Sequence, residues 1–192
     1  LHTLAPALRA WQGWGNDAGQ PLPYELPLED YVLSGTLRPV HASGLRQFSA
    51  SKGHGRTVLA LGIDALVWSA LGETRPVQRL VMDAPPAILM PLPPAAARAR
   101  LQSLLAVYAQ ARRSALPFMP RAAYAWFKRD GGRKGWSDAR GEWLKREGYG
   151  EGQDPWVRLA LRGADPFLDG DHDVVGLADF DVHGGAMIQD ES

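Results

Sequence analysis

The stretch TVLALGIDALVWSAL, from Thr57 to Leu71, decides how the rest of this sequence folds. Apolar residues recur on nearly every side of a helix over about four turns, which is typical of a helix that is buried all round. Thr57 is a suitable N-cap and Gly72 a suitable C-terminal stop. We therefore expect a central helix here, packed against elements from both sides of it in the sequence.

The residues before this helix alternate in the way that strands do. Between Leu22 and Val40, apolar side chains recur at every second position, which predicts a strand. Pro23 and Pro27 cannot donate ladder hydrogen bonds, so the first half of this strand should be bulged or lie at a sheet edge. A turn at residues 41–44 then leads into a second strand, from Leu45 to Ser51, and the two should form a hairpin.

The residues after the central helix predict a second hairpin and then several helices. Residues 79–82 and 87–90 are apolar segments separated by Asp83, Ala84, Pro85 and Pro86. Pro94 begins an amphipathic helix that runs to about Arg113. Shorter helices are expected at 3–14, 120–128, 136–147 and 156–162, with Asp154 as the N-cap of the last and a loop at 130–135. This order predicts a protein of the α/β class with an α+β arrangement, in which helices flank a mixed sheet.

Charge is distributed unevenly along the chain. The formal net charge is zero, yet residues 75–148 carry 14 Lys+Arg against 5 Asp+Glu, whereas residues 149–192 carry 2 against 10. A basic middle favours contact with phosphates or with an acidic protein, although a solvated helix surface has the same composition. We expect residues 1–163 to form one domain, cut from a longer protein, and residues 164–192 to form a poorly ordered acidic tail rich in Gly and Asp.

Several chemistries find no support in the residues. There is no cysteine, which excludes disulfides and thiolate metal sites, and there is no phosphate-binding loop or serine-hydrolase elbow. The five histidines lack metal-ligand spacing, and the alternating Asp169, Asp171 and Asp173 lack the Gly and Glu that a calcium loop needs. We expect no metal and no cofactor. No apolar run is long enough to span a bilayer, and we expect a cytoplasmic protein without membrane contact.

Two segments resemble the closing part of the RecC subunits of bacterial exonuclease V, the RecBCD helicase-nuclease. They are LPFMPRAAYAWFKR, Leu116 to Arg129, and GYGEGQDPWVRLALRG, Gly148 to Gly163. In RecC subunits, a proline-rich stretch enters a helix containing Trp, and a GEGxD turn precedes an aromatic-rich helix. The segment RLVMDAPPAILMPLPP, residues 79–94, fits the same order. The resemblance covers residues 22–163.

This resemblance implies a degenerate restriction-endonuclease-like core of the PD-(D/E)xK group, as in the nuclease domain of the partner subunit RecB. The sequence GTLR would place Arg38 where an active member has its first metal-binding aspartate. The sequence SAS would place Ser49 and Ser51 at the Asp and Lys positions, with Lys52 out of register. These residues cannot hold a divalent cation through anionic oxygens, so no catalytic residue is expected. A shifted register would recruit Asp30 or Asp64.

Three functions remain open. The first is a non-catalytic module that contacts RecB and RecD and guides forked duplex or single-stranded DNA during double-strand break repair by recombination. The second is an active metal-dependent nuclease, and the third is a protein-interaction module without DNA contact. For the first, Tyr124, Trp126 and Trp136 are packing or base-stacking aromatics. The candidate DNA-binding residues are Arg112, Arg113, Arg121, Lys128, Arg129, Arg133 and Lys134.

Overall fold

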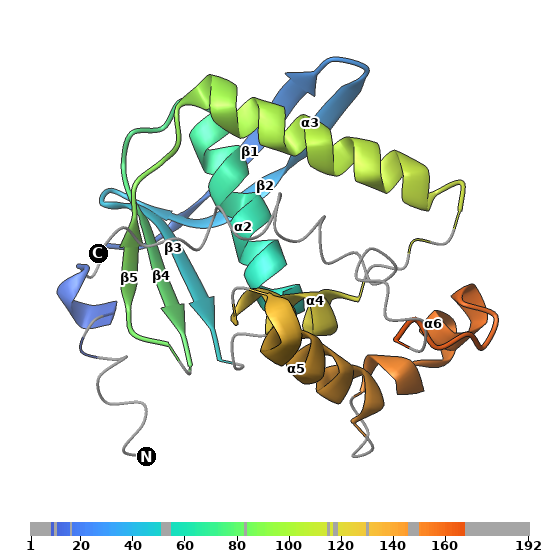
Figure 1. Cartoon of the computed structure of the whole chain (residues 1–192). Coiled ribbons are helices and arrows are strands. Elements are labelled where there is room, and N and C mark those ends of the chain that lie inside the picture. The colour runs from blue at the N-terminus through green and yellow to red at the C-terminus, as the bar shows by residue number, and fades with distance from the viewer. Residues whose placement is uncertain are drawn as a thin grey trace. The chain divides into compact units, whose positions relative to one another are not determined.

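The chain is organised as two compact units. A computed structural model describes residues 9, 11–15, 17–50, 55–82, 84–114, 116, 119–129, 131–145 and 150–167 (Figure 1). The first unit, here called the sheet unit, consists of Leu1–Gly53 and Ala60–Leu104. The second, here called the helical unit, consists of His54–Leu59 and Leu105–Ser192.

The sheet unit contains a mixed sheet. Its described strands lie side by side in chain order, and they are β1 (Gln20–Leu28), β2 (Tyr31–His41), β3 (Gly44–Ser49), β4 (Val77–Val81) and β5 (Ala87–Leu89). Strands β3 and β4 are parallel, because a helix connects them, and the other neighbours are antiparallel. The predicted mixed sheet and the predicted second hairpin are both confirmed.

The prediction of one strand from Leu22 to Val40 is wrong, because the chain reverses in its middle. Glu29 and Asp30 form a tight turn in which Glu29 has a positive φ of 45°, and β1 and β2 pair as a hairpin around it. Apolar residues alternate on both sides of this turn, so the sequence pattern hides it. Strand β1 does lie at the sheet edge, with a register shift between Gln20 and Leu22, as its prolines predict.

The predicted central helix is confirmed as α2 (Gly55–Ala70). Its last five residues, Leu66 to Ala70, are all buried, which requires packing on every side, and the Trp68 indole donates to the Arg75 carbonyl at 2.8 Å. Gly72 ends the helix with a φ of 84°, which favours glycine. Thr57 is not the N-cap, because the helix begins two residues before it.

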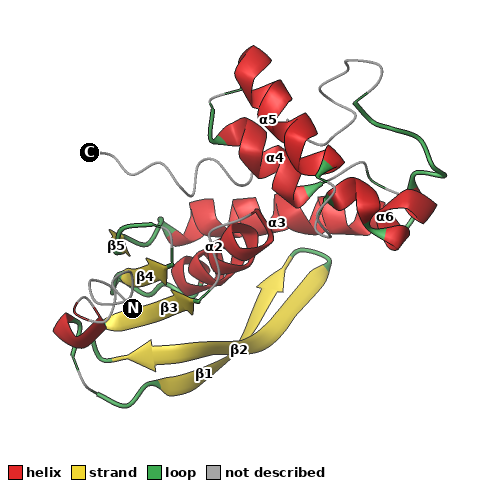
Figure 2. Cartoon of the chain, turned by 90° about the horizontal axis from the view of Figure 1, so that it is seen from below, coloured by secondary structure: helices red, strands yellow, loops and turns green. Residues whose placement is uncertain are grey.

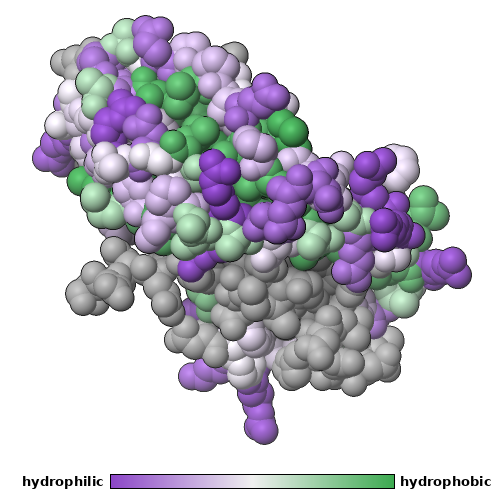
Figure 3. All heavy atoms as spheres, turned by 90° about the horizontal axis from the view of Figure 1, so that it is seen from above, coloured by the Kyte–Doolittle hydropathy of each residue, from purple (hydrophilic) through white to green (hydrophobic). Residues whose placement is uncertain are grey.

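Helix α3 (Pro94–Ala111) also matches its prediction, and it lies with α2 over one face of the sheet (Figure 2). Ala97 and Leu101 are buried, and Arg98 donates to the Pro27 carbonyl of β1 at 3.1 Å. The expected apolar stripe packs in its first half only, because Tyr108 is 57% exposed. Apolar side chains lying open among hydrophilic ones are visible on the surface in Figure 3.

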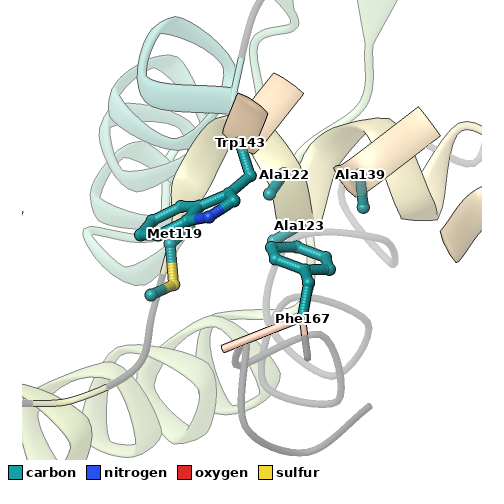
Figure 4. Packing of buried hydrophobic residues seen from close by; sticks show 6 residues of the cluster. All are labelled: Met119, Ala122, Ala123, Ala139, Trp143 and Phe167. Carbon is teal, nitrogen blue, oxygen red and sulfur yellow. The ribbon is translucent and has the colours of Figure 1, made fainter. Parts of the chain in front are cut away.

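The helical unit is built around a small core of six buried residues. Its helices are α4 (Pro120–Phe127), α5 (Gly132–Leu144), the 3-10 turn η1 (Glu151–Gln153) and α6 (Pro155–Ala160). Trp143 of α5 and Phe167 lie beside the alanines of α4 with ring centroids 6.0 Å apart (Figure 4). The core consists of Met119, Ala122, Ala123, Ala139, Trp143 and Phe167.

One boundary differs from the sequence expectation. Helix α5 begins at Gly132 rather than at Trp136, so the predicted loop at 130–135 is wrong from Gly132 onward. The described chain continues past Gly163 to Phe167, which is buried. Of the predicted helix at 3–14, the structure describes helix at Arg9 and residues 11–13 and a turn at Trp14. Residues 3–8 and 10 lie outside the described residues, as do residues 168–192 with the calcium-like aspartates.

Candidate functional site

The sheet face that α2 covers carries a polar group that includes Gln47, two residues before the predicted position Ser49. The Gln47 amide on β3 donates to the Leu61 carbonyl of α2 at 2.6 Å. The Arg79 guanidinium, on the neighbouring strand, donates to the Gln47 side-chain oxygen at 2.9 Å and to the same carbonyl at 3.2 Å. Ser49 lies two residues beyond Gln47 and thus on the same face of β3. A cationic side chain therefore occupies this face.

The carboxylate of Asp64, in α2, interacts electrostatically with Arg79 of this group. Burial raises the pKa of the Asp64 carboxyl above its usual value, and the charge of Arg79 acts in the opposite direction. The pKa of the Tyr24 phenol is also raised, first by burial and then by the charge of Asp64. The charge of Arg79 thus offsets only part of the cost of burying the Asp64 carboxylate.

The predicted nuclease positions are only partly described. Arg38 lies in β2 where the pairing with β1 shifts by one residue, between the pairs Leu22↔Leu37 and Gln20↔Val40. Strand β2 pairs with β3 only through Val40 and His41, and Ser49 pairs with Val81 of β4 instead. No strand pairing thus joins Arg38 to Ser49. Ser51 and Lys52 lie outside the described residues, and the assignment of these positions stays a prediction.

The opposite face of the sheet carries a buried arginine that sequence reasoning did not single out. Arg46 of β3 is 1% exposed, and its guanidinium donates to the Gln78 side chain at 2.9 Å and the Gly15 carbonyl at 2.9 Å. It also donates to the Trp14 carbonyl and lies 5.7 Å from the Trp11 ring centroid. Arg46 therefore fastens residues 11–15 to the sheet. Residues Gly44 to Gln47 are all buried, although Arg46 and Gln47 are polar. The sequence signal for a buried arginine was this mixture of polar and apolar residues on both faces of β3.

Asp17 completes this attachment at the surface. Its carboxylate accepts from the Ala42 amide at 2.9 Å and lies 3.3 Å from Arg46. The Ala42 hydrogen bond lowers the pKa of the Asp17 carboxyl, and the neighbouring His41 and Arg46 lower it further. His41 is buried, and its Nδ1 lies 3.1 Å from the Asp17 carbonyl oxygen. These contacts fix the chain before β1 to the turn between β2 and β3.

All seven candidate DNA-binding residues lie in the helical unit. Arg112 and Arg113 follow α3 and are exposed, as are Arg133 and Lys134 in the first turn of α5. Arg121 is half-buried in α4. The other two have neighbours: Lys128 lies 5.5 Å from the Tyr124 ring centroid, and Arg129 forms an ion pair with Asp138 at 2.7 Å. Their contact with DNA stays a prediction.

The three aromatic candidates are packing residues in the structure. Tyr124, Trp126 and Trp136 are half-buried against the core of the helical unit. Gly131 and Gly135 give Trp126 its space, because a Cβ on Gly131 would approach the Trp126 ring to 2.6 Å and one on Gly135 would approach its backbone oxygen to 2.9 Å. Close packing against Trp126 therefore explains Gly131 and Gly135.

The GEGxD turn has a structural explanation of the same kind. Glu151 is buried, and its carboxylate accepts from the backbone amides of Arg121 and Ala122, both at 2.9 Å, at the start of α4. The adjacent Gly150 and Gly152 approach α5 so closely that a Cβ on either would lie within 3 Å of its backbone oxygens. Glu151 thus caps a helix 30 residues earlier in the sequence.

The same turn starts the next helix. The Asp154 side chain accepts from the amides of Trp156 and Val157, so the predicted N-cap is confirmed. Arg56 reaches the Asp154 carboxylate at 3.7 Å, and both line a cleft of about 280 Å³ together with Arg121 and Glu151. The GEGxD turn therefore holds the helical unit together through both of its acidic residues.

Comparison with known proteins identifies the family. A family model described as the RecC C-terminal domain matches residues 1–131, which is more than half of the chain. No curated protein matches the chain significantly. Among the described residues, no helix is both long and apolar enough to cross a membrane, and no group of three or more His, Asp or Glu side chains has a metal-binding arrangement.

The match includes the sheet, the central helix, α3 and α4, whereas the GEGxD turn follows it in the sequence. The chain therefore belongs to the RecC C-terminal domain family, and this membership implies a role within the RecC subunit of RecBCD, exodeoxyribonuclease V, which acts on DNA in repair and recombination.

Proposed function

We propose that this domain is a non-catalytic part of the RecC subunit. In this proposal the sheet unit is a degenerate endonuclease-like core, and the helical unit guides DNA and contributes to contacts with RecB and RecD. Support for the core comes from the order of its elements: β1, β2 and β3 form an antiparallel meander, α2 crosses over, and β4 returns parallel to β3.

The observation that carries the non-catalytic assignment is the placement of Arg79. A nuclease of this type needs anionic oxygens that converge on a divalent cation. Here the face of β3 that continues to Ser49 carries a neutral Gln47 bonded to the Arg79 guanidinium. The Asp64 carboxylate interacts electrostatically with that same positive charge. A guanidinium repels a divalent cation, so the local electrostatics oppose metal binding.

We expect a RecBCD complex with a disabled RecB nuclease site to leave single-stranded and duplex DNA intact in the presence of Mg²⁺. The physical reason is that the described residues contain no group of acidic side chains that could hold a metal ion. Acid-soluble release of labelled nucleotides measures the activity. Degradation that persists in this complex and is abolished by Asp64→Asn would contradict the proposal.

Support for DNA guidance comes from the start of α5. Arg133 and Lys134 are exposed in its first turn, and this turn contains no acidic residue. The positive end of the helix dipole makes this an unfavourable place for cations, whereas it favours a bound phosphate. Two cations at a helix start contribute nothing to the local stability of the helix, so their placement fits a role in binding an anion.

We expect Arg133→Gln with Lys134→Gln to weaken the binding of forked DNA by the RecC-containing complex. Each lost phosphate contact should reduce the slope of log affinity against log salt concentration by about 0.7–0.9. Fluorescence anisotropy titrations at several salt concentrations measure this slope. The substitutions remove cations from a helix start, so they should not unfold the domain.

Arg140→Gln is the matched control, because Arg140 is exposed further along the same helix and was not a candidate. We expect it to leave the slope nearly unchanged. If both variants keep the wild-type slope while the complex still assembles, the domain is instead an interaction module without DNA contact.

A further inference from the structure

The described part of the helical unit is strongly basic. It carries twelve Lys and Arg residues but only five Asp and Glu residues. Several of the cations, among them Arg158 and Arg162 at α6, are exposed and form no ion pair within the described residues. Uncompensated charge of one sign on a small unit attracts segments of the opposite sign.

Helix α6 also exposes apolar side chains. Trp156 is 77% exposed and Leu159 is 70% exposed. Residues three apart lie on the same side of a helix, so these two side chains form one apolar patch. Arg158 belongs to the same short helix, and Arg162 follows its end. We call these four residues the α6 surface. Exposed tryptophan and arginine together are typical of a binding surface.

The sequence of residues 168–192 is complementary to the α6 surface in two respects. This segment has seven acidic residues and no Lys or Arg, against the cations of the helical unit. Its aspartates are interspersed with apolar residues such as Val174, Val175, Leu177 and Phe180, which match Trp156 and Leu159. The α6 surface has positive charge and exposed apolar area, so it fits a segment that has negative charge and apolar side chains.

The point of attachment places this segment within reach. Residue 168 follows Phe167, which is buried in the core of the helical unit between Trp136 and Trp143. Val157 and Leu161 of α6 pack against the same core. An extended chain spans about 3.3–3.6 Å per residue, so the first aspartates reach α6 after a few residues. The attachment also makes the binding intramolecular, with an effective concentration in the millimolar range for a short linker.

We propose that residues 168–192 bind to the α6 surface and oppose DNA binding by neutralising the positive charge of the helical unit. The inhibitory part of this inference rests on the proposed DNA contact, whereas the binding of the segment does not. The acidic segment acts as an internal competitor of DNA phosphates, and a partner or DNA that displaces it gains access to Trp156 and the neighbouring arginines.

The experiment compares three forms of the chain in the RecC-containing complex. One is the wild type, one ends after Phe167, and one keeps its full length but carries Asp→Asn at positions 169, 171, 173, 179 and 181. The first readout needs no DNA: the acrylamide quenching of Trp156 fluorescence, taken as the difference between each form and its Trp156→Phe counterpart. The second is the affinity for single-stranded DNA at low and high salt.

We expect both altered forms to show stronger quenching of Trp156 than the wild type. They should also bind single-stranded DNA about tenfold more tightly at low salt, with a smaller gain at high salt, because the competition is electrostatic. The Asp→Asn form separates the effect of charge from the effect of shortening the chain.

Unchanged quenching in both altered forms would overturn the inference, and so would quenching that depends on protein concentration, which would assign the α6 surface to a second copy. A failure of the proposed function can be told apart from a failure of this inference. If quenching changes as expected but Arg133→Gln with Lys134→Gln leaves DNA affinity unaltered, the segment binds as inferred and the DNA contact is wrong.

Discussion

Replacing Arg46 by methionine should lower the free energy of unfolding by about 3–5 kcal/mol, because it removes one partner from a buried set of charge-assisted hydrogen bonds. The guanidinium is 1% exposed. Without it, the Gln78 side chain loses a buried donor, and the more exposed carbonyl oxygens of Trp14 and Gly15 lose the guanidinium as well. Chemical denaturation followed by circular dichroism measures the loss.

The loss should be accompanied by release of residues 11–15 from the sheet. Limited proteolysis should then cut near Trp14 in the variant under conditions where the wild type resists. Arg46→Lys should recover little, because an ammonium group cannot reproduce the planar set of donors. Arg56→Met is the control, since Arg56 is 57% exposed in its ion pair and should contribute less than about 1 kcal/mol. If Arg46→Met lowers the free energy of unfolding as little as the control does, Arg46 does not fasten residues 11–15 to the sheet.

Replacing Glu151 by alanine should lower the free energy of unfolding by about 2–3 kcal/mol, because two amides at the start of α4 lose a charged acceptor. Met119 provides no side-chain cap, so nothing else at that position takes over the role. Glu151→Gln should cost less, since its amide oxygen still accepts one hydrogen bond. Urea denaturation of the wild type and both variants measures these differences.

The pH dependence of stability separates the effect of the Glu151 charge from the effect of its side-chain shape. Burial raises the pKa of the Glu151 carboxyl, and the two backbone amides oppose this effect. The folded state therefore binds the proton more tightly than the unfolded state. The stability that proton binding at Glu151 contributes is fully present below the ordinary pKa of 4.5. It is lost as the pH rises through the raised pKa of the folded state.

Glu151→Gln carries no titrating group, so this pH dependence should disappear in it. Urea denaturation at a series of pH values measures the difference between the two proteins. If wild type and Glu151→Gln respond identically between pH 4.5 and neutrality, the raised pKa is not a property of this site.

The residues of the candidate sites were only partly predictable. Arg133 and Lys134 were named from their composition, but their place at a helix start depends on Gly131 and Gly132, both of which have positive φ. Trp126 was named as a packing or stacking residue, and the structure shows packing, because Gly131 and Gly135 leave room for its ring. Arg79 was not named, since nothing in VQRLV indicates that its partner is Gln47, 32 residues earlier.

The sequence alone determined the elements whose signals are local. The apolar run of α2, the stop at Gly72, the prolines that keep β1 at an edge and the Asp154 cap each depend on residues within one or two turns. Their physical basis is periodicity and backbone preference, which a short stretch of sequence contains completely.

Only the tertiary structure decided what the buried charges do. Arg46 bonds to a segment 31 residues earlier, and Glu151 caps a helix 30 residues earlier. Charged side chains are buried only where distant partners satisfy them. Those partners are brought together by the pairing of β3 with β4 and by the packing of η1 near the start of α4. A side chain's own neighbours in the sequence do not specify such partners, so each of these residues reads as an ordinary surface charge until the chain is folded.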